Sequence, residues 1–150
     1  MSRHTNARVQ LALNVSDLDE AVDFYRRLFG TEPAKRHDGY ANFAIDSPPL
    51  KLVLFENAEA PGSLNHLGIE VPTSAEVTTT AQRLDAQGLD AGDPGRETCC
   101  YATQDKVWVT GPDETRWEIY TVLADSPTRA VGDGGCCSAP VAGAEVSAAR

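Results

Sequence analysis

The sequence has few basic residues. Its 150 residues include 13 Lys and Arg against 22 Asp and Glu, which gives a formal net charge of −9 at pH 7. Proteins that bind nucleic acids or anionic membranes need a basic surface for electrostatic attraction. The charge balance therefore argues against both kinds of partner.

Long hydrophobic runs and spaced cysteines are also missing. No apolar stretch approaches the roughly 20 residues of a membrane-spanning helix, and the start, MSRHTNARVQ, has no apolar core typical of a secretory signal. The four cysteines form two adjacent pairs, Cys99–Cys100 and Cys136–Cys137. A disulfide-stapled secreted domain spaces its cysteines differently. We expect a cytoplasmic protein with reduced thiols.

What the sequence contains is a repeated strand pattern. In VQLALNV (9–15) and NHLGIEV (65–71), apolar residues alternate strictly with small or polar ones. Such alternation is typical of strands with one apolar face. Superimposing Gln10 on His66 aligns the two patterns along their whole length. The repeat indicates two related modules in one chain.

A helix is expected after each of these strands. Ser16 with Asp19, and Thr73 with Glu76, have the spacing of a capping box. Gly30 and Gly88 offer C-terminal stops. Helical spacing then places apolar residues on one face of each helix: Leu18, Val22, Tyr25 and Phe29 in the first, and Val77, Ala81 and Leu84 in the second.

Short strand candidates follow each helix: YANFAI and LKLVLFE in the first half, DKVWVT and RWEIYTV in the second. The sequence therefore predicts an α+β fold of two β-α-β-β-β modules, at about 8–58 and about 64–123, forming one domain over 8–123. The small or polar strand faces would make a curved sheet around a cavity. Residues 124–150 are rich in Ala, Gly and Ser and are expected to be a flexible tail that carries Cys136 and Cys137.

Three side chains of the polar strand faces are candidate metal ligands: Gln10, His66 and Glu118. A carboxylate within an apolar strand is costly unless it is paired, hydrogen-bonded or bound to a metal. This set is close to the two-His-one-carboxylate face of non-haem Fe(II) oxygenases, with an amide in place of one imidazole. The alternatives are a hydrogen-bonded core histidine and a glutamate paired with Lys or Arg. His4 and His37 are expected to be solvated.

The strand starts RVQLALNV and LNHLGIEV and the ending KVWVTGPDETRWEIYTV resemble the vicinal oxygen chelate superfamily, the metal-binding fold of glyoxalases and extradiol dioxygenases. Within it, YANFAIDSPPLKLVLFE and ETCCYATQDKVWVTGP are most similar to the carbon–arsenic bond lyases and the related cadmium-induced protein. The resemblance covers about Arg8 to Leu123. It implies Fe(II) held by Gln10, His66 and Glu118, and a substrate held by Cys99 and Cys100.

The resemblance further implies an O2-dependent lyase that converts trivalent organoarsenicals, such as methylarsonous acid, to arsenite. One position departs from the glyoxalase branch: superimposing LKLVLFE on WEIYTVL aligns Lys51 with Glu118, where glyoxalases carry another carboxylate ligand. A protonated lysine does not bind a metal. The ion would therefore keep an open position for dioxygen.

The adjacent thiols Cys99 and Cys100 suit trivalent arsenic, which is soft and binds soft thiolates as a chelate. Neighbouring side chains of a regular strand point to opposite faces, so we expect the pair on a loop or bulge, with DPGRET before it as a flexible lid. The alternative is that both are small buried hydrophobes.

Other functions are also compatible with the sequence. One alternative is a non-catalytic protein of the same fold that binds cadmium or arsenite through its thiols. Another is a different glyoxalase-fold metalloenzyme, such as a fosfomycin thiol transferase. The modules pair either within one chain or between two chains, so a homodimer is also open. The sequence does not separate methyl from aryl arsenicals.

Overall fold

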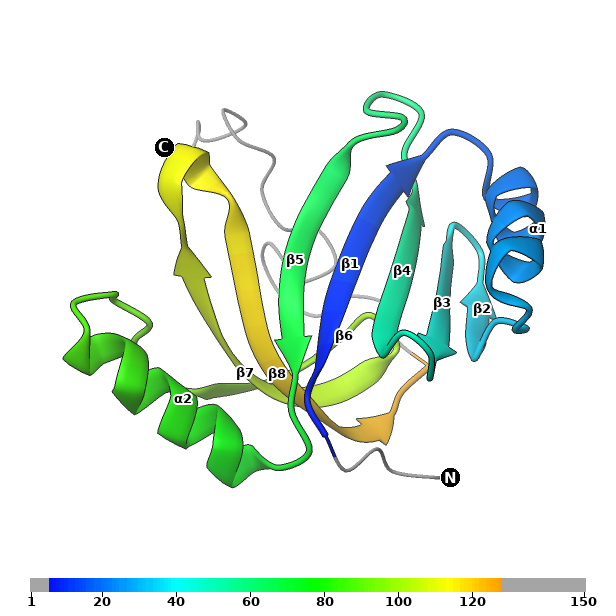
Figure 1. Cartoon of the computed structure of the whole chain (residues 1–150). Helices are drawn as coiled ribbons and strands as arrows, with labels where there is room; N and C mark the ends of the chain where they lie inside the picture. Colours follow the sequence, from blue (N-terminus) through cyan, green and yellow to red (C-terminus); the bar gives the residue numbers. More distant parts are fainter. Residues whose placement is uncertain (1–5, 128–150) are drawn as a thin grey trace. The chain divides into compact units, whose positions relative to one another are not determined.

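The computed structural model describes residues 6–127 (Figure 1). The first module consists of β1 (Arg8–Val15), α1 (Leu18–Phe29), β2 (Lys35–His37), β3 (Tyr40–Ile45) and β4 (Leu50–Glu56). The second consists of β5 (Leu64–Glu70), α2 (Ser74–Ala86), β6 (Gly95–Cys99), β7 (Ala102–Thr110), the short 3-10 helix η1 (Pro112–Glu114) and β8 (Arg116–Asp125). The β-α-β-β-β order thus occurs twice, and the predicted α+β fold class is confirmed.

The chain divides into two compact units, of which one is Arg8–Leu67 and the other begins at Gly68. In the first unit the strands follow the order β2-β3-β4-β1. β1 is parallel to β4, while β2 and β3 run antiparallel to their neighbours. In the second unit the order is β8-β7-β6, with antiparallel pairing throughout. Each unit has its own apolar core.

Helix α1 begins at Asp17, whose carboxylate accepts a hydrogen bond from the Glu20 amide at 3.0 Å. The sequence predicted Ser16 and Asp19 as the capping pair, whereas the structure has Asp17 and Glu20, each one residue further along the chain. A carboxylate is a strong acceptor at a helix N-terminus because it also meets the positive end of the helix dipole. Glu56 at the end of β4 accepts from the Leu18 amide at 3.0 Å. The cap and the sheet therefore fix the start of the helix together.

The apolar face of α1 packs on β3 and β4 as the spacing predicts. Leu18 and Val22 are buried, and Tyr25 and Phe29 pack at the edge of the same cluster. Burying a side chain of this size stabilises a fold by about 1.5–3 kcal/mol. The buried members from the sheet are Ala41, Phe43, Ile45, Leu52 and Leu54.

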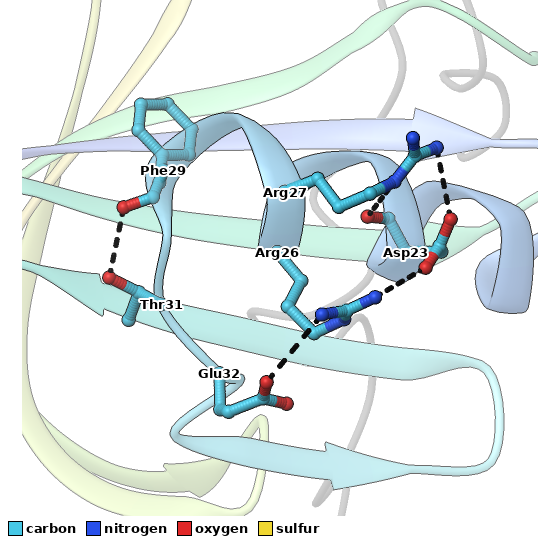
Figure 2. A network of polar contacts seen from close by, with 6 residues as sticks. All are labelled: Asp23, Arg26, Arg27, Phe29, Thr31 and Glu32. Atoms are coloured by element: carbon cyan, nitrogen blue, oxygen red, sulfur yellow. Dashed lines mark hydrogen bonds and ion pairs between the residues drawn. The ribbon is translucent and has the colours of Figure 1, made fainter.

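The exposed end of α1 carries a polar network (Figure 2). Asp23 meets Arg26 at 2.7 Å and Arg27 at 3.0 Å, and Arg26 also faces Glu32 at 3.9 Å. The hydrogen bond from Arg26 holds the pKa of the Asp23 carboxyl below its ordinary value. Because these groups are solvated, water and salt screen them. The network orients the helix end more than it stabilises the fold.

Helix α2 begins as predicted at Thr73, whose hydroxyl accepts from the Glu76 amide at 3.2 Å and donates to the Glu76 carboxylate at 3.1 Å. The helix packs on β7 and β8. Leu84 lies at the edge of this cluster. The buried core of the unit consists of Val71, Val77, Ala81, Val107 and Ile119.

Some sequence expectations differ from the structure. β8 runs to Asp125, two residues into the segment predicted as tail, because Thr103 and Ala102 of β7 pair with Ala124 and Asp125. His37 lies in β2, opposite Tyr40 of β3, and not in a turn. The interpretation of His4, Cys136 and Cys137 lies outside the described residues. Within residues 6–127, no helix has the length and apolarity needed to cross a membrane.

Gly30 ends α1 with a left-handed backbone, at φ 63° and ψ 33°, and its space is open to a Cβ atom. The substitution Gly30→Ala is therefore expected to cost backbone strain alone. We expect the free energy of unfolding to fall by about 1–2 kcal/mol, measured by urea denaturation. Gly95→Ala is the matched control, since Gly95 is equally open and lacks the left-handed φ. An equal loss in both variants would contradict the assignment of strain to Gly30.

Candidate functional site

The polar faces of β1 and β5 are the more buried faces of these strands. Gln10, Asn14 and His66 are exposed by only 5, 1 and 3%. The apolar residues Leu11 and Leu13, on the other face of β1, are only partly buried against the α1 cluster. Buried polar groups are rarely left without hydrogen-bond partners. The partners of these side chains therefore define the candidate site.

Two predicted ligands of the first unit lie in direct contact. The amide nitrogen Nε2 of Gln10 is 3.1 Å from Nε2 of His66. The other ring nitrogen of His66, Nδ1, is 2.8 Å from Oδ1 of Asn65. The ring of Phe55 lies 6.3 Å from the imidazole, measured between ring centres. His66 is thus held on both ring nitrogens.

Behind His66 lies a network that the sequence reasoning missed. Asn65 donates to Oδ1 of Asn14 at 3.1 Å, and Asn14 donates to the hydroxyl of Ser63 at 2.9 Å. The Ser63 hydroxyl donates in turn to the Ala60 carbonyl at 2.5 Å. The only signal in the sequence was Asn14 at a buried alternation position of β1. Its partners lie about 50 residues away along the chain, so spacing could not reveal them.

Lys51 stands beside Gln10. In the parallel register of β1 and β4, Lys51 is paired with Gln10, and on the other side of β4 it is opposite Ala44. It is half-buried. A cationic side chain therefore occupies the strand position where the resemblance places a carboxylate in glyoxalases.

Glu118 of the second unit is buried on β8 and forms an ion pair with Lys106 of β7. Both side chains are almost fully inaccessible, with exposures of 5 and 1%. Ions removed from water lose hydration, so such a pair is maintained by its mutual charge and hydrogen bonds. The alternative that Glu118 pairs with a lysine is thus observed. A carboxylate has two oxygens, and the pair involves one of them.

Cys99 lies on the same side of the β6–β7–β8 sheet as this ion pair. The ammonium group of Lys106 is 3.4 Å from Sγ of Cys99 and also contacts Oε1 of Glu118. The opposite side of these strands, with Val107 and Ile119, faces α2. Lys106 therefore links the predicted substrate-binding sulfur to the predicted carboxylate ligand.

Cys100 lies in a two-residue turn between β6 and β7. Cys99 is paired with Ala102, and the residues between them, Cys100 and Tyr101, have φ of 52° and 62°. Two positive φ values in a two-residue hairpin are typical of a type I′ turn. The cysteine pair thus spans the end of a strand and the start of a turn. The last four residues of the segment DPGRET, 95–98, belong to strand β6 and are not a loop.

Both cysteines are oxidised in the structure, since Cys99 and Cys100 each take part in a disulfide. Within residues 6–127 there is no free cysteine. The expectation of reduced thiols therefore differs from the structure. Disulfide pairing depends on which sulfurs the fold brings together, and the spacing of cysteines does not report that proximity. Thiolate chemistry at this pair requires prior reduction.

A second ion pair holds strand β6 against β7. Arg96 donates to the Asp105 carboxylate at 2.7 and 3.0 Å, and the hydroxyl of Ser74, the first residue of α2, donates to it at 2.5 Å. The hydrogen bond from Arg96 is the main reason that the pKa of Asp105 lies below its ordinary value, and Ser74 adds to it. This cluster connects the cysteine hairpin to the helix.

Arg116 covers the far end of the same sheet face. Its guanidinium lies 4.5 Å from the ring centre of Trp108, the residue paired with Glu118. Burial lowers the pKa of Arg116, and the charge of Glu118 opposes that effect. Among the residues that the structure describes, Nε of Arg116 has no hydrogen-bond partner. Positive groups therefore flank Glu118 on this face.

The donor types fit a divalent ion. In the part of the chain that the structure describes, no three His, Cys, Asp or Glu side chains gather as a ligand set. The predicted set, however, includes an amide, and its amide and imidazole are already adjacent at 3.1 Å. An amide oxygen, an imidazole nitrogen and a carboxylate suit a divalent ion of intermediate softness.

The sequence matches the Glyoxalase/Bleomycin resistance protein/Dioxygenase superfamily over residues 7–119. The chain belongs to this superfamily. The resemblance inferred from the sequence is thereby confirmed. Proteins of the superfamily typically bind a metal ion.

The chain is also similar to proteins named for cadmium and for organoarsenicals. It is 62% identical over 122 residues to the "Cadmium-induced protein CadI" of Mycobacterium tuberculosis, covering 81% of this chain and 80% of that protein. It is 53% identical over 135 residues to the "Trivalent organoarsenical cleaving enzyme" of Thermomonospora curvata, covering 89% of each. The Mn(II)-bound glyoxalase of Novosphingobium aromaticivorans has a similar fold, with a TM-score of 0.59, 18% identity, and coverage of 89% of this chain and 44% of that chain.

The depressed pKa of Asp105 predicts a pH dependence of stability. Because its folded pKa lies below the ordinary value of 3.8, the ionised carboxylate stabilises the fold fully above that pH. The contribution is lost as the pH falls through the lower, folded value. Asp105→Asn is therefore expected to destabilise the protein at pH 7, with a difference from wild type that shrinks below pH 3.8. Urea denaturation from pH 7 downward measures this difference.

Asp90→Asn, at an exposed carboxylate, serves as the control and is expected to show little difference at any pH. If the loss in Asp105→Asn stayed constant as the solution is acidified, the effect would come from packing and not from the charge.

Proposed function

We propose that this protein is an Fe(II)- and O2-dependent lyase that cleaves the carbon–arsenic bond of trivalent organoarsenicals and releases arsenite. The observation that carries the proposal is the contact of one buried ammonium, that of Lys106, with both the Cys99 sulfur and the Glu118 carboxylate. The predicted substrate-binding sulfur and the predicted carboxylate ligand are thus neighbours on one sheet face. The organoarsenical-cleaving relative, 53% identical, supports the substrate class.

In this proposal Gln10, His66 and Glu118 hold the iron. Their donor atoms suit Fe(II), and Lys51 beside Gln10 adds no fourth ligand while it is protonated. When bound, Fe(II) supplies the activation of dioxygen. Methylarsonous acid and O2 together contain the atoms of arsenous acid and formaldehyde, so the reaction needs no further co-reactant.

The two cysteines capture the arsenical after reduction of their disulfides. Trivalent arsenic binds two thiolates as a chelate, with the organic group on its third valence. Once the first sulfur has bound, the second is present at high effective concentration. The turn at Cys100 and Tyr101 releases the pair from the strict alternation of a strand, which would otherwise point the two side chains apart.

Lys106 orients both parts of the site. Its ammonium donates to Cys99 and to the Oε1 atom of Glu118. We assign Lys106 as a positioning residue, with burial of the site excluding water from the bound arsenical.

A non-catalytic binder of cadmium or arsenite is the second candidate. The cadmium-induced relative, 62% identical, favours it, and it needs the thiols without the metal ligands. Another glyoxalase-fold metalloenzyme, such as a thiol transferase, leaves Cys99 and Cys100 without a role. A homodimer and a cytoplasmic location are compatible with the lyase.

The lyase proposal predicts metal- and oxygen-dependent turnover. The reduced protein is reconstituted anaerobically with Fe(II) and mixed with methylarsonous acid, with or without O2. Arsenite is expected only with both Fe(II) and O2. Cys99→Ser and Cys100→Ser are each expected to lower release at least about 100-fold, since the chelate is lost. Full turnover in these variants would refute capture by the pair.

Glu118→Ala separates the two candidates. If the protein is a lyase, the Glu118→Ala variant is expected to bind arsenite but to release none from methylarsonous acid. If the protein is a non-catalytic binder, the variant is expected to behave like the wild type in the arsenite-binding and arsenite-release assays. His37→Gln, at an exposed histidine of β2, is the control and is expected to leave both unchanged.

The buried ion pair gives a separate test of Glu118 as a ligand. Lys106→Met leaves the carboxylate buried without its cation, and we expect a loss of about 3–5 kcal/mol in the free energy of unfolding. If Glu118 binds the metal, Co(II) supplies the missing positive charge. The difference in unfolding free energy between the variant and the wild type then becomes smaller. Urea denaturation with and without Co(II) measures the gap. The double variant Lys106→Met with Glu118→Gln is expected to lose less unfolding free energy than Lys106→Met alone, because no charged carboxylate is left buried. A gap that Co(II) does not change would argue against ligation by Glu118.

A further inference from the structure

A one-way chain of hydrogen bonds runs from Gln10 to a backbone carbonyl in the loop between β4 and β5. Every link lies within the unit Arg8–Leu67, and each has a heavy-atom distance between 2.5 and 3.1 Å. We name this set the relay. Its members, in order, are Gln10, His66, Asn65, Asn14, Ser63 and the carbonyl of Ala60.

The direction of the relay is set at its far end. A backbone carbonyl has no proton to donate, so Ser63 must donate its single hydroxyl proton to Ala60. The Ser63 oxygen can then only accept from Asn14, which must present its Nδ2. The remaining oxygen of Asn14 faces Asn65 and accepts from it.

The same logic continues to the histidine. Asn65 uses its Nδ2 toward Asn14, so its Oδ1 faces the ring of His66. That oxygen only accepts, and Nδ1 of His66 must therefore carry the proton. In the neutral imidazole this leaves Nε2 with its lone pair. The amide of Gln10 accordingly presents Nε2 to it, at 3.1 Å.

We infer that this relay fixes His66 in the Nδ1-protonated tautomer and so keeps Nε2 as the nitrogen that binds the metal, with Asn65, Asn14 and Ser63 as positioning residues. The inference rests on the proposed function for the metal and on observed contacts for the tautomer. A histidine ligand is commonly oriented by a hydrogen bond from its other ring nitrogen. Here that orientation is traced back to the Ala60 carbonyl.

The relay also assigns a movement to Gln10. An amide nitrogen that donates to His66 has no lone pair for a metal, whereas the amide oxygen does. For Gln10 to act as a ligand, its terminal amide turns so that Oε1 replaces Nε2. His66 keeps its tautomer, because its other side is held by Asn65. Gln10 is therefore the single link of the relay that metal binding breaks.

The backbone around the relay is held independently. The Asn14 amide donates to the Ser63 carbonyl at 2.8 Å, and the Gly62 amide donates to the Asn14 carbonyl at 2.9 Å. The Asn57 amide donates to the Val15 carbonyl at 2.8 Å. Loss of the Ser63 hydroxyl is thus expected to release the side chains while the loop stays attached to β1.

The test follows the ring nitrogens of the metal-free, reduced protein by ¹⁵N NMR. The chain has three histidines, so His4→Gln and His37→Gln backgrounds identify the His66 signals. Wild type is expected to show a protonated Nδ1 and an unprotonated Nε2. Ser63→Ala is expected to give a mixture of tautomers, and Asn65→Ala a shift toward protonated Nε2. Ser63→Thr keeps a hydroxyl and is expected to restore the wild-type pattern.

Co(II) titration of the same variants links the tautomer to the metal. Asn65→Ala and Ser63→Ala are expected to weaken Co(II) binding roughly 10–100-fold, and Ser63→Thr to recover it. Asn57→Ala is the matched control, because Asn57 lies in the same loop and its side chain accepts from the Glu59 amide, outside the relay. Should Asn65→Ala not fold, as judged by circular dichroism, Ser63→Ala carries the same test from a position further along the relay.

The outcomes separate the two proposals. Unchanged His66 tautomers in both Asn65→Ala and Ser63→Ala would overturn the relay. Altered tautomers with weakened Co(II) binding support it. Altered tautomers with unchanged Co(II) affinity would keep the relay as the determinant of the tautomer but remove His66 from the ligand set, which contradicts the proposed function.

Discussion

Buried polar groups need hydrogen-bond or ion-pair partners, and the contacts that meet this need recur in both units of the molecule. In one unit the polar residues of β1 and β5 satisfy one another through the relay that ends at the Ala60 carbonyl. In the other, Lys106 satisfies Glu118 and contacts Cys99. An unsatisfied polar group at these depths would cost more than a hydrogen bond contributes. Each network therefore has few alternative arrangements, and its side chains are held ready for binding.

The apolar cores perform a different task, because they position the strands and leave the chemistry to the opposite faces. α1 covers β3 and β4, and α2 covers β7 and β8, so each helix uses the apolar side of its own strands. Within each unit, polar side chains that alternate with these core residues then lie on the other face of the same strands. This division lets a small fold keep ionisable groups in its interior without giving up its hydrophobic stabilisation.

The cysteine hairpin combines a rigid base with a strained tip. The ion pair between Arg96 and Asp105, together with Ser74, fastens β6 and β7 to the start of α2. At the tip, Cys100 and Tyr101 adopt left-handed backbones that cost a non-glycine residue about 1–2 kcal/mol each. Strain of this kind is commonly found where function requires a fixed geometry. In the proposed enzyme it holds the cysteine pair at the end of the strand pair that carries Lys106.

The sequence by itself determined the two modules, the faces of both helices and most strands, because these follow from local periodicity, as in β1 and α2. It also singled out Gln10 and His66 as polar residues at equivalent strand positions, and Glu118 as a carboxylate within an apolar strand. Only the tertiary structure decided their partners: Lys106 for Glu118, Asn65 for His66, and disulfides for Cys99 and Cys100. Periodicity tells which face a side chain occupies. Which atoms meet there depends on contacts between residues distant along the chain, and no local pattern encodes those contacts.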